Sequence, residues 1–256
     1  MKREMIDYHC HLLPAIDDGA SDLQESLRIA MVLARFGFTT VHCTPHMIRG
    51  CYENLPEHVV RNTATMQTIL DKEGIELHLV PGTEHYLDEF LPALLPHALT
   101  VGPSNYMLVE APFRADADVI PSFTSILAIR GLLPLIAHPE RCKAFAPPSR
   151  EGGWRAAFPA FFGRHHEPDE QVSLMHHLLQ SGCRFQGNLG SFAGMYGDEI
   201  QQRAILFLKQ GVYSCLGSDS HRSADLETML YTGYGVIVAE IGESAAADLL
   251  AGTFRT

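Results

Sequence analysis

Short apolar runs alternate with amphipathic stretches along nearly the whole chain, and this alternation constrains the fold more than any other feature of the sequence. Met5–His9 is predicted to form a strand, Ser21 and Gln24 provide a capping box for the helix that follows, and Gly37 ends that helix. One face of this helix carries apolar residues at helical spacing: Leu23, Leu27, Ala30, Met31 and Ala34. Repeated strand–helix units predict an α/β fold with a parallel sheet.

The same alternation continues to the C-terminus and predicts about seven strands in total. The six further strands are expected at Thr39–Cys43, Glu76–Val80, Tyr106–Val109, Pro134–Ala137, Arg184–Gly187 and Val212–Leu216. Five further helices are expected at Glu57–Glu73, Ile120–Ile129, Glu170–Gln180, Asp198–Lys209 and Ile241–Leu250. Barrels of alternating strands and helices often form one domain at a length of 256 residues, so we expect a single domain over residues 1–256.

One stretch, Cys142–Asp169, interrupts the alternation. It contains four prolines, three glycines and the only tryptophan, Trp154. Such a composition predicts an inserted loop at about residues 142–169. Loops of this length are either lids over a site or tolerated surface insertions, and the sequence leaves both open.

Charge and cysteine usage exclude several classes of function. The formal net charge of −11 argues against nucleic acid as a partner, because such binding depends on Lys and Arg. The six cysteines form no C-x-x-C pair and the N-terminus shows no apolar signal core, so we expect a cytoplasmic protein with reduced thiols. No apolar run reaches the roughly 18 residues of a membrane span, so we expect no direct membrane insertion.

Residues of the metal-ligand type follow almost every predicted strand. His9 and His11 end the first strand, and on their own they are weak evidence in a chain with 14 histidines. The ends of other strands carry His46, Glu84, Glu110, His138, Asp219 and His221. Strand ends converge on one face of a β/α barrel, so a single metal cluster explains all of them together.

A count of charges connects this cluster to phosphate chemistry. The candidate ligands are five neutral histidines and four carboxylates: His9, His11, His46, His138, His221, Asp18, Glu84, Glu110 and Asp219. Three divalent cations would leave two positive charges over, which match a phosphate dianion. This donor set suits Mn, Zn or Fe better than Ca. Divalent metals activate water for attack on phosphorus, and Arg141 is placed to bind the phosphate.

Eight segments resemble, in order, the polymerase-and-histidinol-phosphatase (PHP) superfamily, and within it the bacterial capsule-type tyrosine phosphatases. They are Asp7-x-His9-x-His11, Ile16-Asp17-Asp18-Gly19, Thr44-Pro45-His46, Pro81-Gly82-x-Glu84, Glu110, His138-Pro139-Glu140-Arg141, Gln186-x-Asn188-x-Gly190-Ser191 and Ser218-Asp219-x-His221. The resemblance implies a distorted seven-stranded β/α barrel of the TIM-like PHP type. It also implies manganese-dependent hydrolysis of phosphotyrosine on the tail of a membrane-bound bacterial tyrosine kinase that controls capsule or exopolysaccharide synthesis.

The same resemblance implies roles for individual residues. Two or three divalent metals are expected, Mn first and Fe or Zn as alternatives, on three ligand groups: His9, His11, Glu84 and Asp219; Glu84, Glu110 and His138; Asp18, His46 and His221. Arg141, Asp219 and His221 are the expected catalytic residues. Behind them, or at the phosphate, we expect Asp7 to orient a ligating histidine, with Asn188 and Arg222 nearby. Arg222 is a candidate replacement for a second family arginine, whose position here is Leu226.

Three alternatives remain open from the sequence. Cys43 and Arg49 have the Cys-x5-Arg spacing of a cysteine-based phosphatase, although the intervening residues include Pro45 and no glycine. A small-molecule phosphatase, acting on histidinol phosphate or a sugar phosphate, would use the same ligands. A non-catalytic regulator that docks on a kinase is the third. A homo-oligomer is also compatible with the sequence, because Glu25 and Arg28 on the first helix form either an assembly interface or a solvated face.

Overall fold

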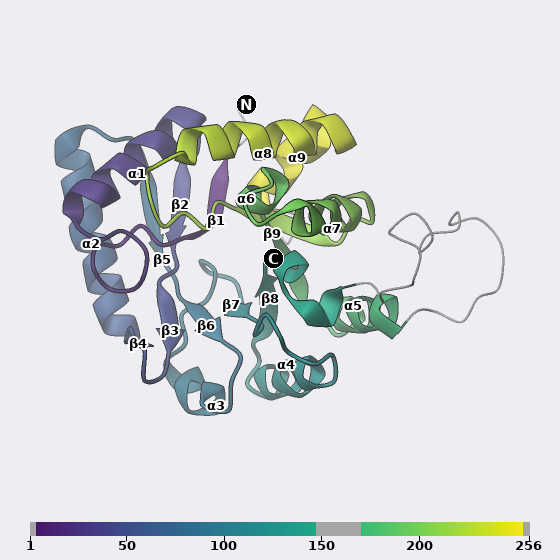
Figure 1. The fold of residues 1–256 in the computed structure, drawn as a ribbon. Helices are drawn as coiled ribbons and strands as arrows, with labels where there is room; N and C mark the ends of the chain where they lie inside the picture. The colour runs from purple at the N-terminus through teal and green to yellow at the C-terminus, as the bar shows by residue number, and fades with distance from the viewer. Residues whose placement is uncertain (1–3, 147–169, 253–256) are drawn as a thin grey trace.

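The computed structural model describes residues 4–146 and 170–252, and within them ten strands form two sheets (Figure 1). In the smaller sheet, β2 (Thr40–Cys43) lies between β1 (Ile6–Cys10) and β5 (His78–Pro81), and all pairs are parallel. The larger sheet has the order β10-β9-β8-β7-β6-β3-β4 and is parallel except for the β3–β4 hairpin. Its strands are β3 (His46–Ile48), β4 (Tyr52–Glu53), β6 (Glu84–Tyr86), β7 (Tyr106–Glu110), β8 (Leu133–Ala137), β9 (Arg184–Asn188) and β10 (Tyr213–Gly217).

The predicted mixed α/β fold with parallel pairing is confirmed, but the expected count of seven strands is wrong. Short breaks separate β2 from β3 at Thr44-Pro45 and β5 from β6 at Gly82-Thr83. Pro45 has no amide hydrogen, so it cannot continue a regular ladder. The two sheets approach each other again at the isolated parallel bridge between Cys10 and Ser220. These pairings do not by themselves close a barrel.

Helices connect the strands and cover the sheets. They are α1 (Leu23–Phe36), α2 (Pro56–Glu73), α3 (Leu91–Leu94), α4 (Val119–Ile129), α5 (Glu170–Gln180), α6 (Leu189–Phe192), α7 (Asp198–Lys209), α8 (Leu226–Ile241) and α9 (Glu243–Ala251), with the short 3-10 turns η1 (Leu95–His97), η2 (Pro139–Arg141) and η3 (Lys143–Phe145). The predicted stop at Gly37 is confirmed, with φ 118°. The predicted N-cap is wrong by one residue, because Asp22 rather than Ser21 accepts the hydrogen bond from the Glu25 amide.

The sequence pattern missed α8, a helix of 16 residues. Gly233 and Gly235 lie in its interior, and glycine has a low helix propensity. Gly233 is needed for packing: a Cβ at this position would lie 2.3 Å from the backbone oxygen of Leu189 in α6. Close contact between α6 and α8 therefore outweighs the local preference of the sequence.

The predicted loop at residues 142–169 begins too early. Cys142, Ala144 and Phe145 are buried, and the Phe145 ring packs edge-on against Phe185 of β9 at a centroid distance of 5.7 Å. Residues 142–146 are therefore part of the folded core, because these apolar side chains cover the sheet. Residues 147–169 lie outside the described residues. No helix in the described part of the chain is both long enough and apolar enough to cross a membrane.

Substituting Gly233 by alanine should destabilise the protein, because the new methyl group would collide with the α6 backbone. We expect a loss of about 1–3 kcal/mol in the free energy of unfolding, measured by urea denaturation. The control is Gly235→Ala on the same helix, where a Cβ would meet nothing within 4 Å. This control should leave stability unchanged or raise it by up to about 1 kcal/mol. Equal stability of both variants would contradict the described α6–α8 contact.

Candidate metal centre

The predicted ligands from the strands lie together, at or just after the carboxyl ends of β1, β2, β5, β7, β8 and β10. His9 lies in β1 and His11 just beyond it, while His46 and Glu84 follow the ends of β2 and β5 and are the first residues of β3 and β6. The others are Glu110 at the end of β7, His138 after β8, and Asp219 and His221 after β10. Most of these side chains are buried, with Asp18, His46 and His221 toward the exposed side. Parallel strands explain this convergence, because their carboxyl ends share one edge.

The carboxylate of Glu84 lies at the centre of the cluster. Its Oε2 is 3.1 Å from His9 Nε2, 3.3 Å from His11 Nε2 and 3.0 Å from His46 Nδ1. Its Oε1 is 3.1 Å from His138 Nε2. Within the described residues Oε2 nevertheless has no partner with hydrogen-bond geometry, and neither has His46 Nδ1. Nitrogen and oxygen atoms that approach a common point without bonding to one another are arranged as ligands of a cation.

Asp219 completes the first group of candidate ligands. Its Oδ1 lies 3.4 Å from His9 Nε2 and 3.3 Å from His11 Nε2, the two nitrogens that also face Glu84. On the other side of Glu84, His138 Nε2 is 3.8 Å from Glu110 Oε1. The structure thus brings together the residues expected around the first and second metals.

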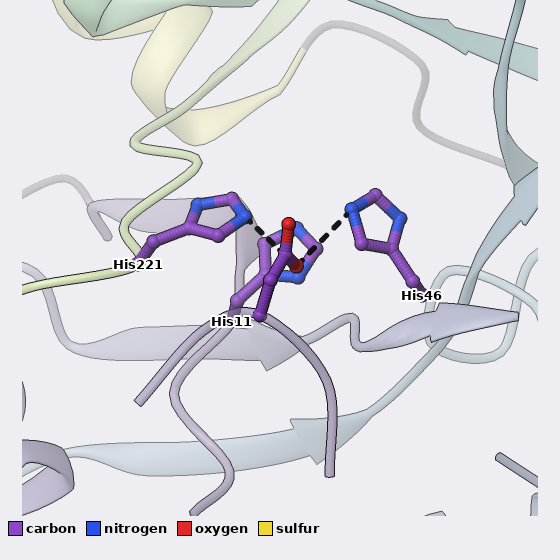
Figure 2. A group of neighbouring side chains, drawn as sticks. His11, His46 and His221 are labelled. Carbon is purple, nitrogen blue, oxygen red and sulfur yellow. Dashed lines mark ion pairs between the residues drawn. The ribbon is translucent and has the colours of Figure 1, made fainter. Parts of the chain in front are cut away.

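A third group lies at the exposed side of the cluster. Asp18 Oδ1 is 3.5 Å from His46 Nε2 and 3.4 Å from His221 Nε2. Figure 2 shows His11, His46 and His221 around this point, with dashed lines for the two ion pairs. One ligand atom from each of these four residues lies within 4.8 Å of the others. His11 therefore adjoins two groups, which the sequence did not indicate.

The electrostatics of the cluster favour bound cations. Burial lowers the pKa of His9, but the carboxylates of Glu84 and Asp219 outweigh it and raise that pKa to about 9. Burial and the neighbouring Glu84 raise the pKa of Glu110 to about 8. Burial, with Arg141, lowers the pKa of His138 to about 4. Carboxylates crowded in a buried site need positive charge, and neutral imidazoles supply lone pairs, so the donor set fits Mn, Fe or Zn.

Two ligands adopt a backbone conformation that is rare for residues other than glycine. His138 has φ 30° and Asp219 has φ 52°. The Asp219 amide donates to the His9 carbonyl at 2.7 Å, and the Arg141 amide donates to the His138 carbonyl at 2.9 Å. Such strain persists only where surrounding bonds impose it, and it occurs most often at functional sites.

Asp17 and Gln186 orient two of the histidines, a role that the sequence motifs alone did not indicate. Asp17 Oδ2 is 2.8 Å from His11 Nδ1, and Gln186 Oε1 is 2.9 Å from His9 Nδ1. Since each oxygen accepts a hydrogen bond from Nδ1–H, the lone pair of each ring is placed on Nε2, which faces the cluster. Both residues occur in the quoted motifs, so the available signal was their position beside Asp18 and Asn188.

The sequence predicts that Asp7 orients a ligating histidine, and its contact with His9 is made to the backbone amide and not to the imidazole ring. Its carboxylate instead accepts hydrogen bonds from the Ser218 hydroxyl at 2.5 Å, from the Ser218 amide at 2.8 Å and from the His9 amide at 3.2 Å. Asp7 lies in β1, next to the end of β10. The groups that its carboxylate contacts there are backbone amides and a hydroxyl rather than imidazole rings. It therefore fixes the start of the segment that carries Asp219.

The remaining predicted residues differ in their distance from the cluster. Arg141 Nη1 donates to Asp219 Oδ2 at 2.7 Å. Asn188 Nδ2 donates to the same oxygen at 2.8 Å, and its Oδ1 accepts from the Gly190 amide. Asn188 thus holds Asp219 through its side-chain nitrogen, while its side-chain oxygen is fixed by the start of α6. Arg222 is exposed, and Leu226 is buried at the start of α8.

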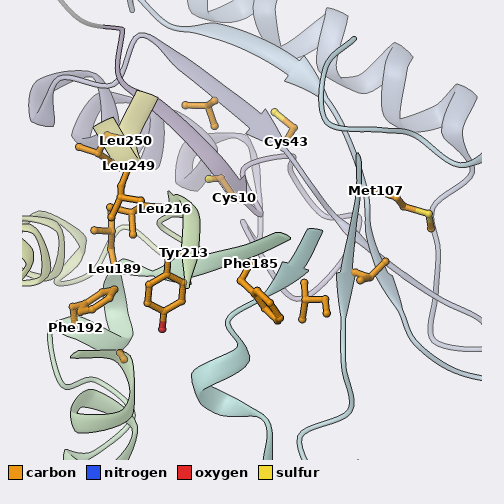
Figure 3. Close-up of a cluster of buried hydrophobic side chains, with 14 of the residues drawn as sticks. Cys10, Cys43, Met107, Phe185, Leu189, Phe192, Tyr213, Leu216, Leu249 and Leu250 are labelled. Carbon is orange, nitrogen blue, oxygen red and sulfur yellow. The ribbon is translucent and has the colours of Figure 1, made fainter. Parts of the chain in front are cut away.

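The cysteine-based alternative does not fit the geometry. Cys43 lies in β2 among buried apolar side chains and is 0% exposed (Figure 3). Burial raises the pKa of its thiol to about 12, so the reactive thiolate is not formed near neutral pH. Arg49 is exposed, and its guanidinium lies over the ring of Phe90. A nucleophile must reach its substrate, and this thiol does not.

Comparison with known proteins places the chain in a family. The sequence profile described as "Capsular polysaccharide synthesis, CpsB/CapC" matches residues 5–149, more than half of the chain. The chain belongs to the CpsB/CapC family. Tyrosine-protein phosphatase YwqE of Bacillus subtilis (strain 168) is 31% identical over 223 residues, which cover 85% of this chain and 77% of YwqE. Tyrosine-protein phosphatase CpsB of Streptococcus pneumoniae is 24% identical over 252 residues, covering 96% and 94%.

Solved structures agree with this family assignment. One from a study of YwqE and CpsB, described as unique metal-dependent tyrosine phosphatases, has a TM-score of 0.79 and 29% identity, and the match covers 96% of this chain and 94% of that chain. The lactonase Lmo2620 from Listeria monocytogenes has a TM-score of 0.50 at 11% identity, which is a likeness of fold alone. The resemblance to the capsule-type tyrosine phosphatases is confirmed.

Removing the Asp17 carboxylate should weaken metal binding without unfolding the protein. Asp17→Ala frees His11 to change tautomer or ring orientation, so we expect about 10- to 100-fold weaker Mn²⁺ binding in competition with a chromophoric chelator. Asp17→Asn keeps an oxygen acceptor and should recover part of the affinity. Asp116→Ala, which removes an exposed carboxylate, is the matched control. Unchanged affinity in Asp17→Ala would contradict the orienting role.

Proposed function

We propose that the chain is a metal-dependent phosphoesterase that hydrolyses phosphotyrosine in proteins. The observation that carries this proposal is the convergence of three ligand groups around Glu84, with Arg141 at their edge. The relatives named as tyrosine-protein phosphatases support the substrate. We further propose that the whole chain, residues 1–256, acts as one domain related to the PHP barrel.

The proposed chemistry assigns a task to each part of the site. His9, His11, Glu84 and Asp219 would hold one metal, Glu84, Glu110 and His138 would hold a second, and Asp18, His46 and His221 would hold a third. Two or three divalent metals, with Mn as first choice and Fe or Zn as alternatives, would supply an activated water and neutralise phosphate charge.

Arg141 is placed to bind the phosphoryl group. Its Nη1 is committed to Asp219, but the structure gives Nε and Nη2 no hydrogen-bond partner within residues 4–146 and 170–252. Burial lowers the pKa of Arg141, but Asp219 outweighs it and raises that pKa, so the guanidinium stays charged. The two remaining donors can bind phosphate oxygens, and the Asp219 bond holds them in place during the reaction.

His221 is better suited to ligation than to proton donation. Its Nδ1 lies 2.8 Å from the backbone oxygen of Asp219, which can only accept, so Nδ1 carries the proton. In the neutral ring the lone pair is then on Nε2, which faces Asp18. The expected catalytic role of His221 is therefore exerted through the third group of ligands.

The physiological substrate that we propose is the phosphotyrosine tail of a membrane-bound bacterial tyrosine kinase that controls capsule or exopolysaccharide synthesis, with hydrolysis in the cytoplasm. The family description and the names of the relatives support this context. A chain with net charge −11 needs bound cations to attract such an anionic substrate, and the cluster provides their ligands.

Chelation should abolish hydrolysis of a phosphotyrosine peptide, and added Mn²⁺ should restore it, because the ligand cluster alone has no means to activate water. His138→Ala should lose roughly 100-fold or more of the turnover while keeping its circular dichroism spectrum. Cys43→Ser should retain activity. Activity that survives chelation and disappears in Cys43→Ser would overturn the proposal in favour of a cysteine nucleophile.

A further inference from the structure

Two aromatic rings enclose the Arg141 guanidinium at the rim of the cluster. The guanidinium carbon lies 4.7 Å from the centroid of the Phe113 ring and 4.4 Å from that of Tyr196, over the face of each. The Phe113 ring also lies 6.1 Å from the ring of His138. The two rings come from the segment after β7 and the segment after α6, so residues far apart in the sequence meet at one arginine.

Both rings are partly exposed to solvent, although contact with the arginine does not require an exposed ring. Phe113 is 45% exposed and Tyr196 is 38% exposed, while Met195 beside it is 58% exposed. Single exposed apolar residues are common on protein surfaces. Apolar side chains that adjoin a buried group of carboxylates and imidazoles indicate a ligand site, because such sites combine apolar surface with a few polar groups.

The position of Arg141 determines which part of a substrate would reach the rings. Phosphate oxygens held by the bound metals and by Nε and Nη2 of Arg141 would lie on the buried side, where the ligand cluster is. The ester oxygen and the group attached to it must point away from that buried side. Phe113 and Tyr196 adjoin Arg141 and are both partly exposed, so the leaving group would lie against these rings.

We propose that Phe113 and Tyr196 form the binding surface for the aromatic ring of the leaving group and so select aryl phosphates over alkyl phosphates. This specificity rests on the phosphoesterase function proposed above. An aryl group on this binding surface makes ring–ring contacts and buries apolar surface. A serine or sugar leaving group gains neither and would leave its own polar groups beside apolar rings.

The test compares binding of two peptides of identical sequence to the Mn²⁺-loaded protein by calorimetry. One carries a non-hydrolysable phosphonate analogue of phosphotyrosine, and the other carries the corresponding analogue of phosphoserine. Phe113→Leu and Tyr196→Leu should each lower the preference for the aromatic peptide by about three- to tenfold. Tyr196→Phe keeps the ring and should keep the preference.

Phe90→Leu is the matched control, since Phe90 makes the same kind of contact with Arg49 at 4.8 Å and should leave the ratio of the two affinities unchanged. If both peptides weaken by the same factor in Phe113→Leu and Tyr196→Leu, the rings only position Arg141 and the inference fails. An unchanged ratio in both variants also overturns it. Hydrolysis of phosphotyrosine peptide by the wild type, measured separately, tests the proposed function independently of this ratio.

Discussion

A single buried carboxylate, that of Glu84, determines how the rest of the site is arranged. Its two oxygens face four imidazole nitrogens at 3.0 to 3.3 Å, and Oε2 has no hydrogen bond in the described structure. Burying a charge in this way is costly unless an opposite charge compensates it. Parallel strands deliver histidines from several directions to the same point, and the proposed metals would turn this crowding into binding energy.

Bonds behind the ligands keep the site in place. Glu140 is fully buried, and its carboxylate accepts from the Asn188 amide at 3.1 Å and from the Tyr213 hydroxyl at 2.9 Å. Asn188 in turn donates to Asp219, which also receives the Arg141 guanidinium. A continuous chain of bonds thus connects the turn after β8 with the ends of β9 and β10. It supports the left-handed backbone of Asp219 and fixes the arginine proposed to bind phosphate.

The sequence predicted seven of the ten described strands and the convergence of the ligands, because both depend on local patterns. Apolar runs mark buried strands, and polar residues at their ends are brought together by parallel pairing. What it missed depends on contacts between distant segments. The break at Pro45, the packing of Gly233 on α6 and the bond from Asp17 to His11 are visible only once the chain is folded. Local helix propensity even disfavours α8, because the interior of this helix contains two glycines.

The arrangement of the site requires that the three ligand groups around Glu84 bind divalent metals. Anomalous diffraction from crystals of the Mn²⁺-loaded protein, recorded at the manganese absorption edge, would locate these metals. We expect peaks among His9, His11, Glu84 and Asp219 and in the adjoining groups, and loss of the peaks that touch Glu84 in crystals of Glu84→Ala. Manganese that is absent from this cluster, or bound only elsewhere on the chain, would contradict this expectation.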